Sequence, residues 1–297
     1  METPPKIPDL TFERVLGRGG MSVVWLARHE KMNRNVAVKV LNAEAAQSGQ
    51  DIRQFMQETR IMTELSHPNI VKGFESDCAD DGRYYFIMEY VDGYTFNDFI
   101  EKKNVLKESD ALIIAQAVAE ALEYGWQTMK IIHCDIKPDN IMVNSAGEIK
   151  LADFGLCEVF DETRQPIAAK EEILGTPAYM SPEQILATDK LDFRTDIYSL
   201  GASLYHLITK NLLFNFQKQD DILRAHAEEE FQAVDPRVFN RNITSGFVHL
   251  LEKMLVKDRD NRYKAWNYVF NDAKTVETTG ILPEVPRNIK SSLKVLN

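Results

Sequence analysis

Three polar side chains in residues 131–156 have the types and the spacing that phosphate chemistry needs. They are Asp135, Asn140 and Asp153. Short apolar runs surround them, and the turn residues 144–147 separate these runs, a pattern that predicts a loop followed by a β-hairpin. Mg²⁺ prefers oxygen ligands and commonly takes one or two from protein carboxylates and the others from phosphates and water. Two carboxylates and a carboxamide held by short strands therefore predict a Mg²⁺ site.

The same stretch resembles part of a known family. HCDIKPDN (residues 133–140), followed by DFG (residues 153–155), is similar to the catalytic loop and the metal-binding loop of protein kinases, written H-R-D-x-x-x-x-N and D-F-G. The resemblance implies that Asp135 accepts the proton of the substrate hydroxyl, while the asparagine and the second aspartate hold metal ions. Cys134 stands where the family has arginine. Any Asp-rich loop before a hairpin has a similar spacing, so the other parts of such a site must also be present.

A glycine-rich segment lies upstream. Residues 11–41 alternate between apolar and polar side chains and predict three antiparallel strands. Between the first two strands, GRGGMSVV (residues 17–24) resembles the kinase loop G-x-G-x-x-G-x-V, with Ser22 at the third glycine position. Glycine lets a backbone approach phosphates and adopt positive φ, although hairpin turns use glycine as well. VAVK (residues 36–39) matches V-A-I-K, so the resemblance makes Lys39 the residue that binds the α- and β-phosphates.

A helix is expected next, because residues 51–65 carry apolar side chains at helical spacing. Glu58 lies on this helix, and the family counterpart pairs with the strand lysine, so Glu58 would orient Lys39. By sequence alone Glu58 could be a plain surface carboxylate, and Glu64 is a rival. The spacing to HPNIV (residues 67–71), a common kinase run after this helix, favours Glu58.

The adenine site is expected after two further strand runs, residues 70–74 and 84–90. EYVDG (residues 89–93) resembles the hinge between kinase lobes, and backbone groups of Glu89 and Val91 should meet the adenine edge. The apolar members of this site would suit an ordinary core equally well. The resemblance implies ATP contacts from Leu16, Gly17, Arg18, Gly19, Gly20, Met21, Ser22, Val23, Val24, Ala37, Lys39, Met88, Glu89, Val91 and Met142.

The second half of the chain is mainly helical. Residues 111–122 are apolar on most sides, which predicts a buried helix that carries the catalytic loop. GTPAYMSPE (residues 175–183) looks like the end of a kinase activation segment, with Ser-Pro-Glu in place of Ala-Pro-Glu. By the same resemblance, Asp196 hydrogen-bonds the catalytic-loop backbone, and Arg262 pairs with Glu183. Both roles are structural, since a buried Arg–carboxylate pair fixes geometry.

The ordered motifs imply a two-lobed protein kinase fold of the α+β class. A β-rich N-lobe with one regulatory helix should lead through a hinge into a mainly helical C-lobe. Few apolar repeats follow this domain, and the residues before it are proline-rich, so both ends of the chain are expected to be loosely held. The expected divisions are a lead-in (1–10), a kinase domain (11–270, with N-lobe 11–88, hinge 89–94 and C-lobe 95–270) and a C-terminal tail (271–297).

Composition and charge limit the possible partners. The chain has 297 residues and a formal net charge of −10, which disfavours nucleic acid and acidic membrane surfaces as partners. Cys78, Cys134 and Cys157 show no metal-ligand spacing and indicate a reducing cytosol. The first ten residues lack the features of a signal peptide, and the longest helical apolar stretch falls short of the roughly 20 residues that span a bilayer. We expect a cytoplasmic protein, or the cytosolic portion of a longer one.

The resemblance implies transfer of the γ-phosphoryl group of ATP to a protein hydroxyl, with Mg²⁺, or alternatively Mn²⁺, as the metal. Lys137 lies two residues after Asp135, as in Ser/Thr kinases, and the overall sequence is most similar to bacterial eukaryotic-like Ser/Thr protein kinases. A pseudokinase that binds ATP without turnover is the alternative, and Cys134 is its only support. A kinase of small molecules is a third interpretation, which DIKPDN and the Ser-Pro-Glu segment disfavour.

Two departures from the family concern regulation. Cys134 and Glu158 occupy positions where many kinases carry basic residues that bind a phosphate on the activation segment. Residues 153–183 also contain seven acidic and only two basic side chains, so a phosphate there would meet like charges. The candidate phosphorylation sites are Thr163 and Thr176, and the hydroxyl of the latter could instead bridge the catalytic-loop aspartate and lysine. We predict activity that does not depend on phosphorylation of this segment.

Overall fold

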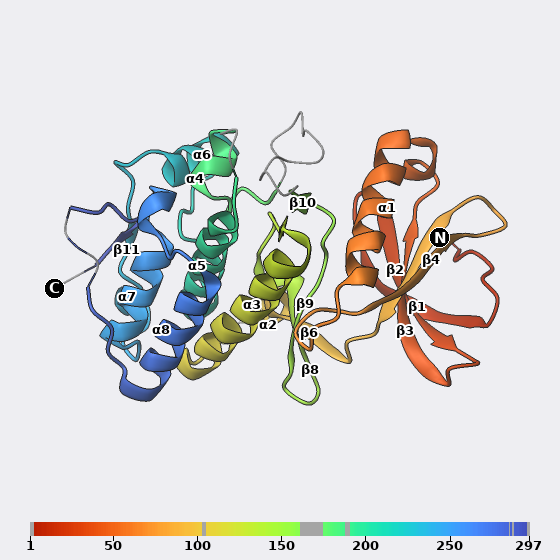
Figure 1. Ribbon diagram of the computed structural model, residues 1–297, viewed down its shortest axis with the longest axis horizontal. Helices are drawn as coiled ribbons and strands as arrows, with labels where there is room; N and C mark the ends of the chain where they lie inside the picture. Colours follow the sequence, from red (N-terminus) through yellow and green to blue (C-terminus); the bar gives the residue numbers. More distant parts are fainter. Residues whose placement is uncertain are drawn as a thin grey trace. The chain divides into compact units, whose positions relative to one another are not determined.

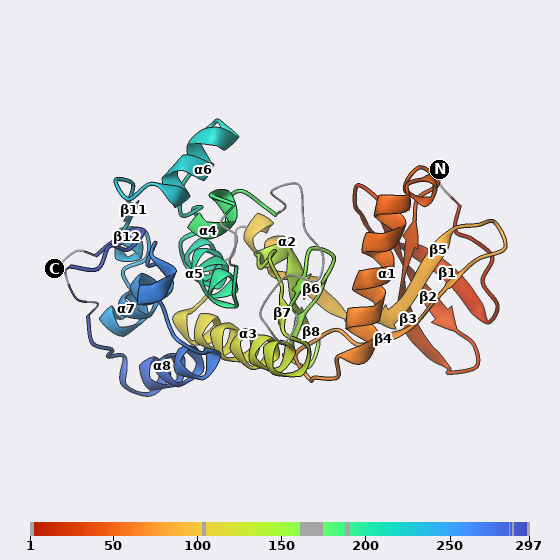
Figure 2. The same ribbon diagram turned by 45° about the horizontal axis from the view of Figure 1, so that its top comes forward.

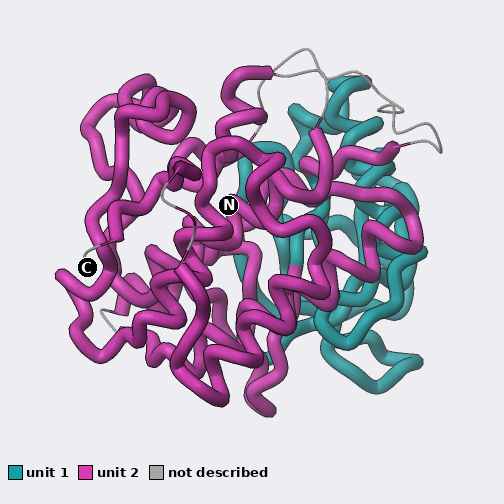
Figure 3. The backbone as a smooth tube through the Cα atoms, turned by 60° about the vertical axis from the view of Figure 1, so that its left-hand side comes forward, with its two compact units in different colours: residues 1–93, 152–155 teal, residues 94–151, 156–297 magenta. Residues whose placement is uncertain are grey.

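The computed structural model describes residues 3–102, 105–160, 175–187, 191–284, 286 and 288–295. The chain forms two compact units, which Figure 3 colours separately. Unit 1 contains residues 1–93 and 152–155, and unit 2 contains residues 94–151 and 156–297. Among the described residues, no helix combines the length and the hydropathy needed to cross a membrane.

Unit 1 is built on a five-stranded antiparallel sheet with the strand order β1-β2-β3-β5-β4 (Figures 1 and 2, with β5 labelled in Figure 2). The three antiparallel strands expected in residues 11–41 are confirmed. A short 3-10 helix, η1 (Ala45–Gln47), and helix α1 (Gly49–Glu64) follow β3. The strands are β1 (Leu10–Arg18), β2 (Ser22–His29), β3 (Arg34–Leu41), β4 (Gly73–Cys78) and β5 (Tyr84–Glu89).

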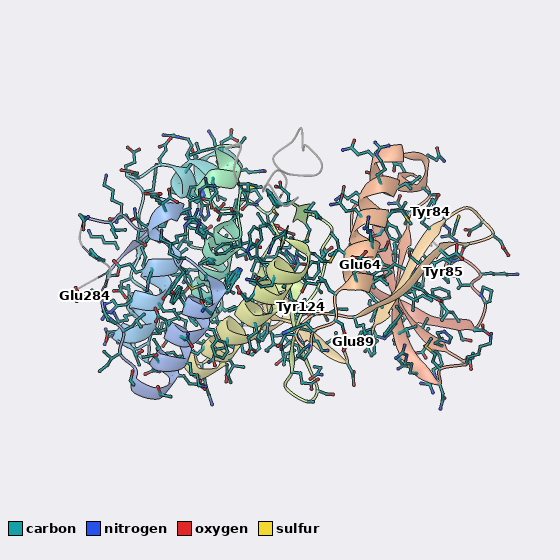
Figure 4. All side chains as sticks on the ribbon, viewed as in Figure 1. Glu64, Tyr84, Tyr85, Glu89, Tyr124 and Glu284 are labelled. Atoms are coloured by element: carbon teal, nitrogen blue, oxygen red, sulfur yellow. The ribbon has the colours of Figure 1, made fainter. Side chains whose placement is uncertain are left out.

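The two faces of this sheet differ in what they carry. Successive side chains of a strand point to opposite faces, so Val36, Val38 and Val40 share one face of β3 while Ala37 and Lys39 share the other. The valine face packs with Ala27, Tyr85 and Ile87 into a buried cluster. Tyr85 is labelled on β5 in Figure 4, next to Tyr84. Helix α1 starts where the Ser48 side chain accepts a hydrogen bond from the Asp51 N–H, as an N-cap does.

Two expectations for unit 1 are wrong. The strand predicted at residues 70–74 begins only at Gly73, because Ile70 and Val71 are buried apolar residues of the preceding loop rather than members of the ladder. The lead-in is not loosely held either. Ile7 is 8% exposed and belongs to the valine-face cluster, and the Arg83 guanidinium donates to the carbonyl oxygen of Thr3.

Unit 2 is mainly helical. Its small sheets are β6-β8-β9, the antiparallel pair β7–β10 and the parallel pair β11–β12. The helices are α2 (Phe96–Glu101), α3 (Glu108–Met129), η2 (Pro138–Asn140), α4 (Pro182–Ile185), α5 (Arg194–Thr209), α6 (Gln219–Ala227), η3 (Pro236–Val238), α7 (Ser245–Met254), η4 (Arg259–Asn261) and α8 (Trp266–Thr279). The strands are β6 (Gly93–Thr95), β7 (Ile131–Ile132), β8 (Ile141–Asn144), β9 (Ile149–Leu151), β10 (Glu158–Val159), β11 (Ala233–Val234) and β12 (Leu293–Lys294).

The core of unit 2 surrounds α5, in which every residue from 195 to 209 except His206 is buried. The buried helix expected at residues 111–122 lies within α3, which runs beside α8 in Figures 1 and 2. The expected hairpin after the catalytic loop is also present, as the antiparallel strands β8 and β9. These elements surround a catalytic loop whose ends are fixed by a helix on one side and a hairpin on the other.

The expectation of a loosely packed C-terminal tail is wrong for the described residues. Helix α8 continues to Thr279, and Ala273 and Val276 on it are buried. Beyond the helix, Leu293 is 1% exposed and β12 pairs with β11. The apolar positions of α8 have helical spacing, whereas the later strand has only two residues and offers no periodic signal.

Candidate active site

A buried ion pair joins two of the expected site residues of unit 1. The Lys39 Nζ atom on β3 lies 2.6 and 2.7 Å from the two carboxylate oxygens of Glu58 on α1. Only 3% of the Glu58 side chain is exposed. Burial lowers the pKa of Lys39, but the carboxylates of Glu58 and Asp153 outweigh it and the net pKa is raised. The ammonium is therefore fixed in its charged form at one position on the sheet.

Glu64, the rival of Glu58, lies in a different environment. Its carboxylate pairs with Arg60 one helical turn earlier at 3.0 Å, and both side chains are exposed. Figure 4 labels Glu64 on α1. Such an exposed i, i+4 pair contributes little to stability or geometry. Among the described residues, Glu58 and not Glu64 is thus the carboxylate paired with Lys39.

Asp153 approaches the same lysine from a strained backbone. Its φ is +60°, in the left-handed region, and its Oδ1 atom lies 3.4 Å from Lys39 Nζ. Gly155 follows in a tight place, where a Cβ atom would lie 3.1 Å from Glu58 Oε2 and 3.2 Å from Asp153 Oδ1. The Gln54 side chain donates to the Gly155 carbonyl oxygen at 2.9 Å. Within unit 1, the DFG segment is therefore held against α1 and the ion pair.

The glycine-rich loop turns between β1 and β2. The Gly19 N–H donates to the Ser22 carbonyl oxygen at 2.8 Å, and the Asn42 side chain donates to the Gly20 carbonyl oxygen at 2.9 Å. None of the three loop glycines has positive φ, so that part of the expected reason for glycine is not met. No heavy atom lies within 4 Å of a Cβ built on Gly17 or Gly20. These two glycines therefore leave open space beside the backbone of the loop.

The expected adenine-binding residues of unit 1 share one face of the sheet. Val24 pairs opposite Lys39, and Met88 pairs opposite Ala37, so all four side chains lie on the face that carries the ion pair. The Glu89 N–H donates to the Lys72 carbonyl oxygen at 2.8 Å. A contact from the Glu89 backbone to adenine would therefore use its carbonyl group.

In unit 2, Asp135 is the centre of a compact polar group. Its Oδ1 atom accepts a hydrogen bond from the Thr176 hydroxyl at 2.9 Å, and its Oδ2 atom lies 2.7 Å from Lys137 Nζ. Lys137 also donates to the Thr176 hydroxyl oxygen at 2.8 Å. The bridge that the sequence allowed for Thr176 is present in the structure. Thr163, the other candidate phosphorylation site, lies outside the described residues.

Asn140 has an orientation that suits a metal ligand. Its side-chain NH₂ group donates to the backbone oxygen of Asp135 at 2.9 Å and to Asp135 Oδ2 at 3.2 Å. These bonds turn the amide so that its oxygen is the atom left for another partner. A hard carbonyl oxygen beside carboxylates is what Mg²⁺ prefers, so the residue fits the group that the sequence predicts. Met142, expected near adenine, lies half-buried on β8.

The backbone before Asp135 is held by Asp196. The two carboxylate oxygens of Asp196 accept from the N–H groups of His133 and Cys134 at 2.7 and 2.8 Å. Burial raises the pKa of Asp196, and the two N–H hydrogen bonds lower it. Burial has the larger effect, and the pKa is raised to about 7. Cys134 has a φ of +66°, in the left-handed region. The expected contact between Asp196 and the catalytic loop is therefore present, and it fixes an unusual turn of the chain.

Glu183 and Arg262 form the expected pair. The guanidinium makes two hydrogen bonds to the carboxylate, at 2.7 and 2.9 Å, and both side chains are buried. Burial raises the pKa of Glu183, but the Arg262 charge outweighs it and the net pKa lies below the ordinary value of 4.5. Thr195 adds a hydrogen bond from its hydroxyl at 2.9 Å.

Sequence reasoning missed Gln184. Its side-chain NH₂ group donates to the Cys134 carbonyl oxygen at 2.9 Å, next to Asp135. Its side-chain oxygen accepts from the Ser181 N–H, while the Ser181 hydroxyl accepts from the Gln184 N–H, which makes a capping box at the start of α4. Ser181-Pro-Glu-Gln184 carries the S-x-x-Q signature of that box, so a signal for the helix start was available.

Cys134 points into apolar surroundings. It forms a buried cluster with Ile132 and Phe160, against which Trp126 and Leu191 pack. At the position where the family has an arginine, the described residues thus place a thiol among apolar side chains.

Comparison with known proteins adds independent information. The family model described as protein kinase domain matches residues 10–272. The chain is 37% identical over 262 residues to a probable serine/threonine-protein kinase of Clostridium perfringens, covering 88% of this chain and 37% of that protein. It is 34% identical over 265 residues to the serine/threonine-protein kinase PrkC of Bacillus subtilis, covering 88% and 39%. It is 31% identical over 291 residues to PknB of Mycobacterium tuberculosis, covering 97% and 46%.

The chain thus spans less than half the length of these relatives. Among solved structures, the crystal structure of a double mutant of the Mycobacterium tuberculosis PknI kinase domain matches with a TM-score of 0.70. It is 24% identical, and the match covers 93% of this chain and 100% of that one. The expected two-lobed α+β kinase fold is confirmed.

Proposed function

Because this chain belongs to the protein kinase family, we propose that it transfers the γ-phosphoryl group of ATP to a serine or threonine hydroxyl of a protein. The observation that carries the proposal is the hydroxyl of Thr176 held between the Asp135 carboxylate and the Lys137 ammonium. An aliphatic hydroxyl that donates to a carboxylate is the arrangement that an acceptor Ser or Thr needs before transfer.

In the proposed reaction, the acceptor oxygen forms a bond to the γ-phosphorus. The bond from the γ-phosphorus to the oxygen it shares with the β-phosphate breaks, and ADP leaves. Asp135 orients the hydroxyl and takes its proton, while Lys137 offsets negative charge on the transferred group. Because the lysine is already 2.7 Å from Asp135, the two charges are positioned before the acceptor arrives.

ATP would bind through the residues expected from the sequence. Lys39, fixed by Glu58, binds the α- and β-phosphates, and the loop from Leu16 to Val24 covers them. The shared face of the sheet supports this proposal, because Ala37 and Met88 lie beside Lys39 on it. Val91, Met142 and the carbonyl of Glu89 complete the proposed adenine contacts.

The proposed metal ligands are Asp153 and Asn140. When bound, Mg²⁺ supplies positive charge that offsets the charge of the phosphates. The amide orientation of Asn140 supports its part, since both hydrogen bonds from its NH₂ group end on Asp135. Asp153 keeps 49% of its side chain exposed although it reaches Lys39, so its carboxylate is also accessible to solvent.

We also propose that transfer does not require a phosphate on the activation segment. The support is Cys134, which packs with Ile132 and Phe160 instead of presenting a cation. A phosphate is attracted by arginine and lysine and gains nothing from apolar side chains. We expect Thr163→Ala to keep the wild-type kcat, with Thr275→Ala on α8 as a matched control. Loss of activity in Thr163→Ala, restored by Thr163→Glu, would show that this proposal is wrong.

The proposed partners are ATP and a protein with an acceptor Ser or Thr, in a reducing cytosol. The support for the compartment is the sequence, in which Cys78, Cys134 and Cys157 do not form the even set that a disulfide framework needs. We propose no nucleic-acid partner and no membrane contact by this chain itself, since its formal net charge is −10.

The test is label transfer from ATP labelled at the γ-phosphate to myelin basic protein by the purified chain with Mg²⁺. Acid hydrolysis of the product then identifies the labelled amino acid. We expect label on serine and threonine and none from ATP labelled at the α-phosphate. Nucleotide binding without transfer would support the pseudokinase instead, and label on tyrosine would contradict the proposed specificity.

A further inference from the structure

The end of the chain docks on unit 2 through its backbone. Residues 288–295, here named the C-terminal strap, contain β12, which lies beside β11 in Figure 2. The Ser292 N–H donates to the Leu255 carbonyl oxygen at 2.8 Å, and the Ser292 carbonyl oxygen accepts from the Ala233 N–H at 2.6 Å. The strap begins after residue 272, where the match to the family ends.

The middle of the strap is part of the core. Ser291, Ser292 and Leu293 are 3%, 0% and 1% exposed. The Ser291 hydroxyl donates to the Glu252 carbonyl oxygen at 2.8 Å, at the end of α7. On the outer side, Lys290 pairs with Glu229 at 2.6 Å, and both of these side chains are more than half exposed.

Ser292 completes a buried chain of polar groups. Its hydroxyl lies 2.8 Å from the Tyr198 hydroxyl, which lies 2.9 Å from Nδ1 of His226. All three residues are 0% exposed. Burial lowers the pKa of His226 to about 3, with a further contribution from Lys257, so the imidazole is neutral. An aspartate at position 292 would bury a carboxylate beside a phenol and a neutral imidazole. Burying this unpaired charge has a high free-energy cost, so we expect the strap to undock.

Tyr198 connects the strap to the catalytic loop. The Arg262 guanidinium lies over the Tyr198 ring, 4.9 Å from its centroid, and binds Glu183 through two hydrogen bonds. The next residue, Gln184, holds the Cys134 carbonyl oxygen at 2.9 Å, directly before Asp135. A continuous series of contacts within unit 2 therefore runs from the strap to the residue that would accept the proton.

We propose that the C-terminal strap is a conformational switch of unit 2, in which Ser292 is a positioning residue. Docked, the strap holds Tyr198 against Arg262, which keeps Glu183 and Gln184 in the places that fix the catalytic loop. Released, it frees Tyr198, and transfer to a protein acceptor falls. The backbone groups of Ala233 on β11 and of Leu255 after α7 thus form a binding site whose occupant is the chain's own residues 288–295. This inference rests on the proposed function.

The test compares variants of the 297-residue chain at position 292. Ser292→Asp releases the strap, Ser292→Ala removes only the bond to Tyr198, and Ser145→Asp adds the same charge at an exposed turn between β8 and β9 as a control. We expect Ser292→Asp to lower kcat for a protein acceptor at least tenfold and Ser292→Ala about threefold. The KM for ATP stays within twofold, because the ion pair of unit 1 is untouched. Hydrogen exchange at the amides of Ala233 and Ser292 should accelerate in both variants and not in the control.

A synthetic peptide of residues 288–295 should restore kcat to Ser292→Asp, and the same peptide carrying Ser292→Asp should not. Accelerated exchange with an unchanged kcat would overturn the inference, since the strap would then be structural only. Unchanged exchange would overturn it as well. If Ser292→Asp does not fold, hydrogen exchange and kcat of Ser292→Ala test the inference instead. Wild-type transfer is measured first, so an inactive wild type contradicts the proposed function, and an active wild type with equally active variants contradicts only the switch.

Discussion

At the scale of single residues, the buried ion pair of Lys39 and Glu58 leads to a prediction about the free energy of unfolding. Glu58 is 3% exposed, so Lys39→Met leaves a buried carboxylate without its cation. Removing one partner of a buried pair costs about 3–5 kcal/mol. We predict that Lys39→Met lowers the free energy of unfolding by about this amount, and that Lys39→Met combined with Glu58→Leu regains most of it. We expect neither variant to transfer the phosphoryl group, since both lack the ammonium that we propose binds the phosphates. Urea unfolding and label transfer provide the two measurements.

The matched control is Lys31→Met, which removes a lysine whose side chain is 74% exposed and which pairs with Asp9. Exposed pairs contribute less than about 1 kcal/mol, so this variant should unfold nearly as the wild type does. Equal losses in Lys31→Met and Lys39→Met would contradict the assignment of a buried pair.

Cys134 supports a second prediction. The side chain packs with Ile132 and Phe160, so Cys134→Arg places a charge among apolar groups. We expect this variant to lose more than about 3 kcal/mol of stability and to gain no dependence on phosphorylation. Cys134→Ser, a change of similar size without a full charge, should keep kcat within threefold. A stable Cys134→Arg variant with activity that rises on phosphorylation would show that the position is a vacant phosphate pocket.

Single residues were predictable where the family motif constrains both type and spacing. Glu58 could be preferred to Glu64 from its spacing to the kinase-like run HPNIV, and of these two residues the structure places only Glu58 beside Lys39. Gln184 was missed, because its contact with the Cys134 carbonyl oxygen joins residues 50 positions apart. No local pattern encodes such a partner, although the capping box marked where its helix begins.

At the scale of elements, prediction succeeded where periodicity reflects burial on one face. The alternation in residues 11–41 matches β1, β2 and β3, since each contributes a face to the core of unit 1. It failed at residues 70–74, because Ile70 and Val71 are buried in a loop and mimic a strand. It also failed for β4, an edge strand whose Glu75, Asp77 and Cys78 are exposed and carry no apolar signal.

Helix α4 supports a prediction about pH, through the pair of Glu183 and Arg262. The folded pKa of Glu183 lies below its ordinary value of 4.5, because the Arg262 charge outweighs the effect of burial. As the pH falls through 4.5, the unfolded chain binds a proton before the folded chain does, so acid favours unfolding. The stabilisation from this pair is therefore present above 4.5 and is lost as the pH falls through the folded pKa.

Glu183→Gln removes the titrating group and leaves Arg262 buried without a carboxylate. We predict that this variant is less stable than the wild type at pH 7, and that the difference in the free energy of unfolding narrows as the pH falls below 4.5. Urea unfolding of both proteins, from pH 7 to below pH 4.5, measures this difference in the free energy of unfolding. A difference that stays constant with pH would mean that Glu183 does not titrate differently in the two states.

At the scale of the whole molecule, the formal net charge of −10 should influence which acceptors are captured. Raising the ionic strength from about 0.01 M to about 0.15 M shortens the Debye length from about 30 Å to about 8 Å. We predict that the KM for myelin basic protein rises roughly three- to tenfold over this range while kcat stays constant. A short uncharged acceptor peptide is the control, and its KM should change less than twofold. A salt-independent KM for the basic protein would contradict long-range attraction.

The whole-molecule arrangement was predictable as far as the family motifs reach. The division into a β-rich and a mainly helical part follows from the change of period along the chain. The docking of the C-terminal strap does not, because β12 has two residues and its partner β11 lies about sixty residues earlier. Apolar spacing in α8 was present at Trp266, Val269, Ala273 and Val276, and it should have excluded a loose tail for that helix.

The most direct test of the account is phosphoryl transfer by Asp135→Asn beside the wild type. An amide keeps the shape of the carboxylate but cannot take the acceptor proton, and general-base catalysis contributes about 10²–10⁴-fold. We predict that kcat falls by a factor in this range while the affinity for ATP changes less than threefold. Asp220→Asn, the same change at an exposed position of α6, should leave both unchanged. Wild-type transfer matched by Asp135→Asn would contradict the account at its centre, because Asp135 would then not be the residue that orients the acceptor.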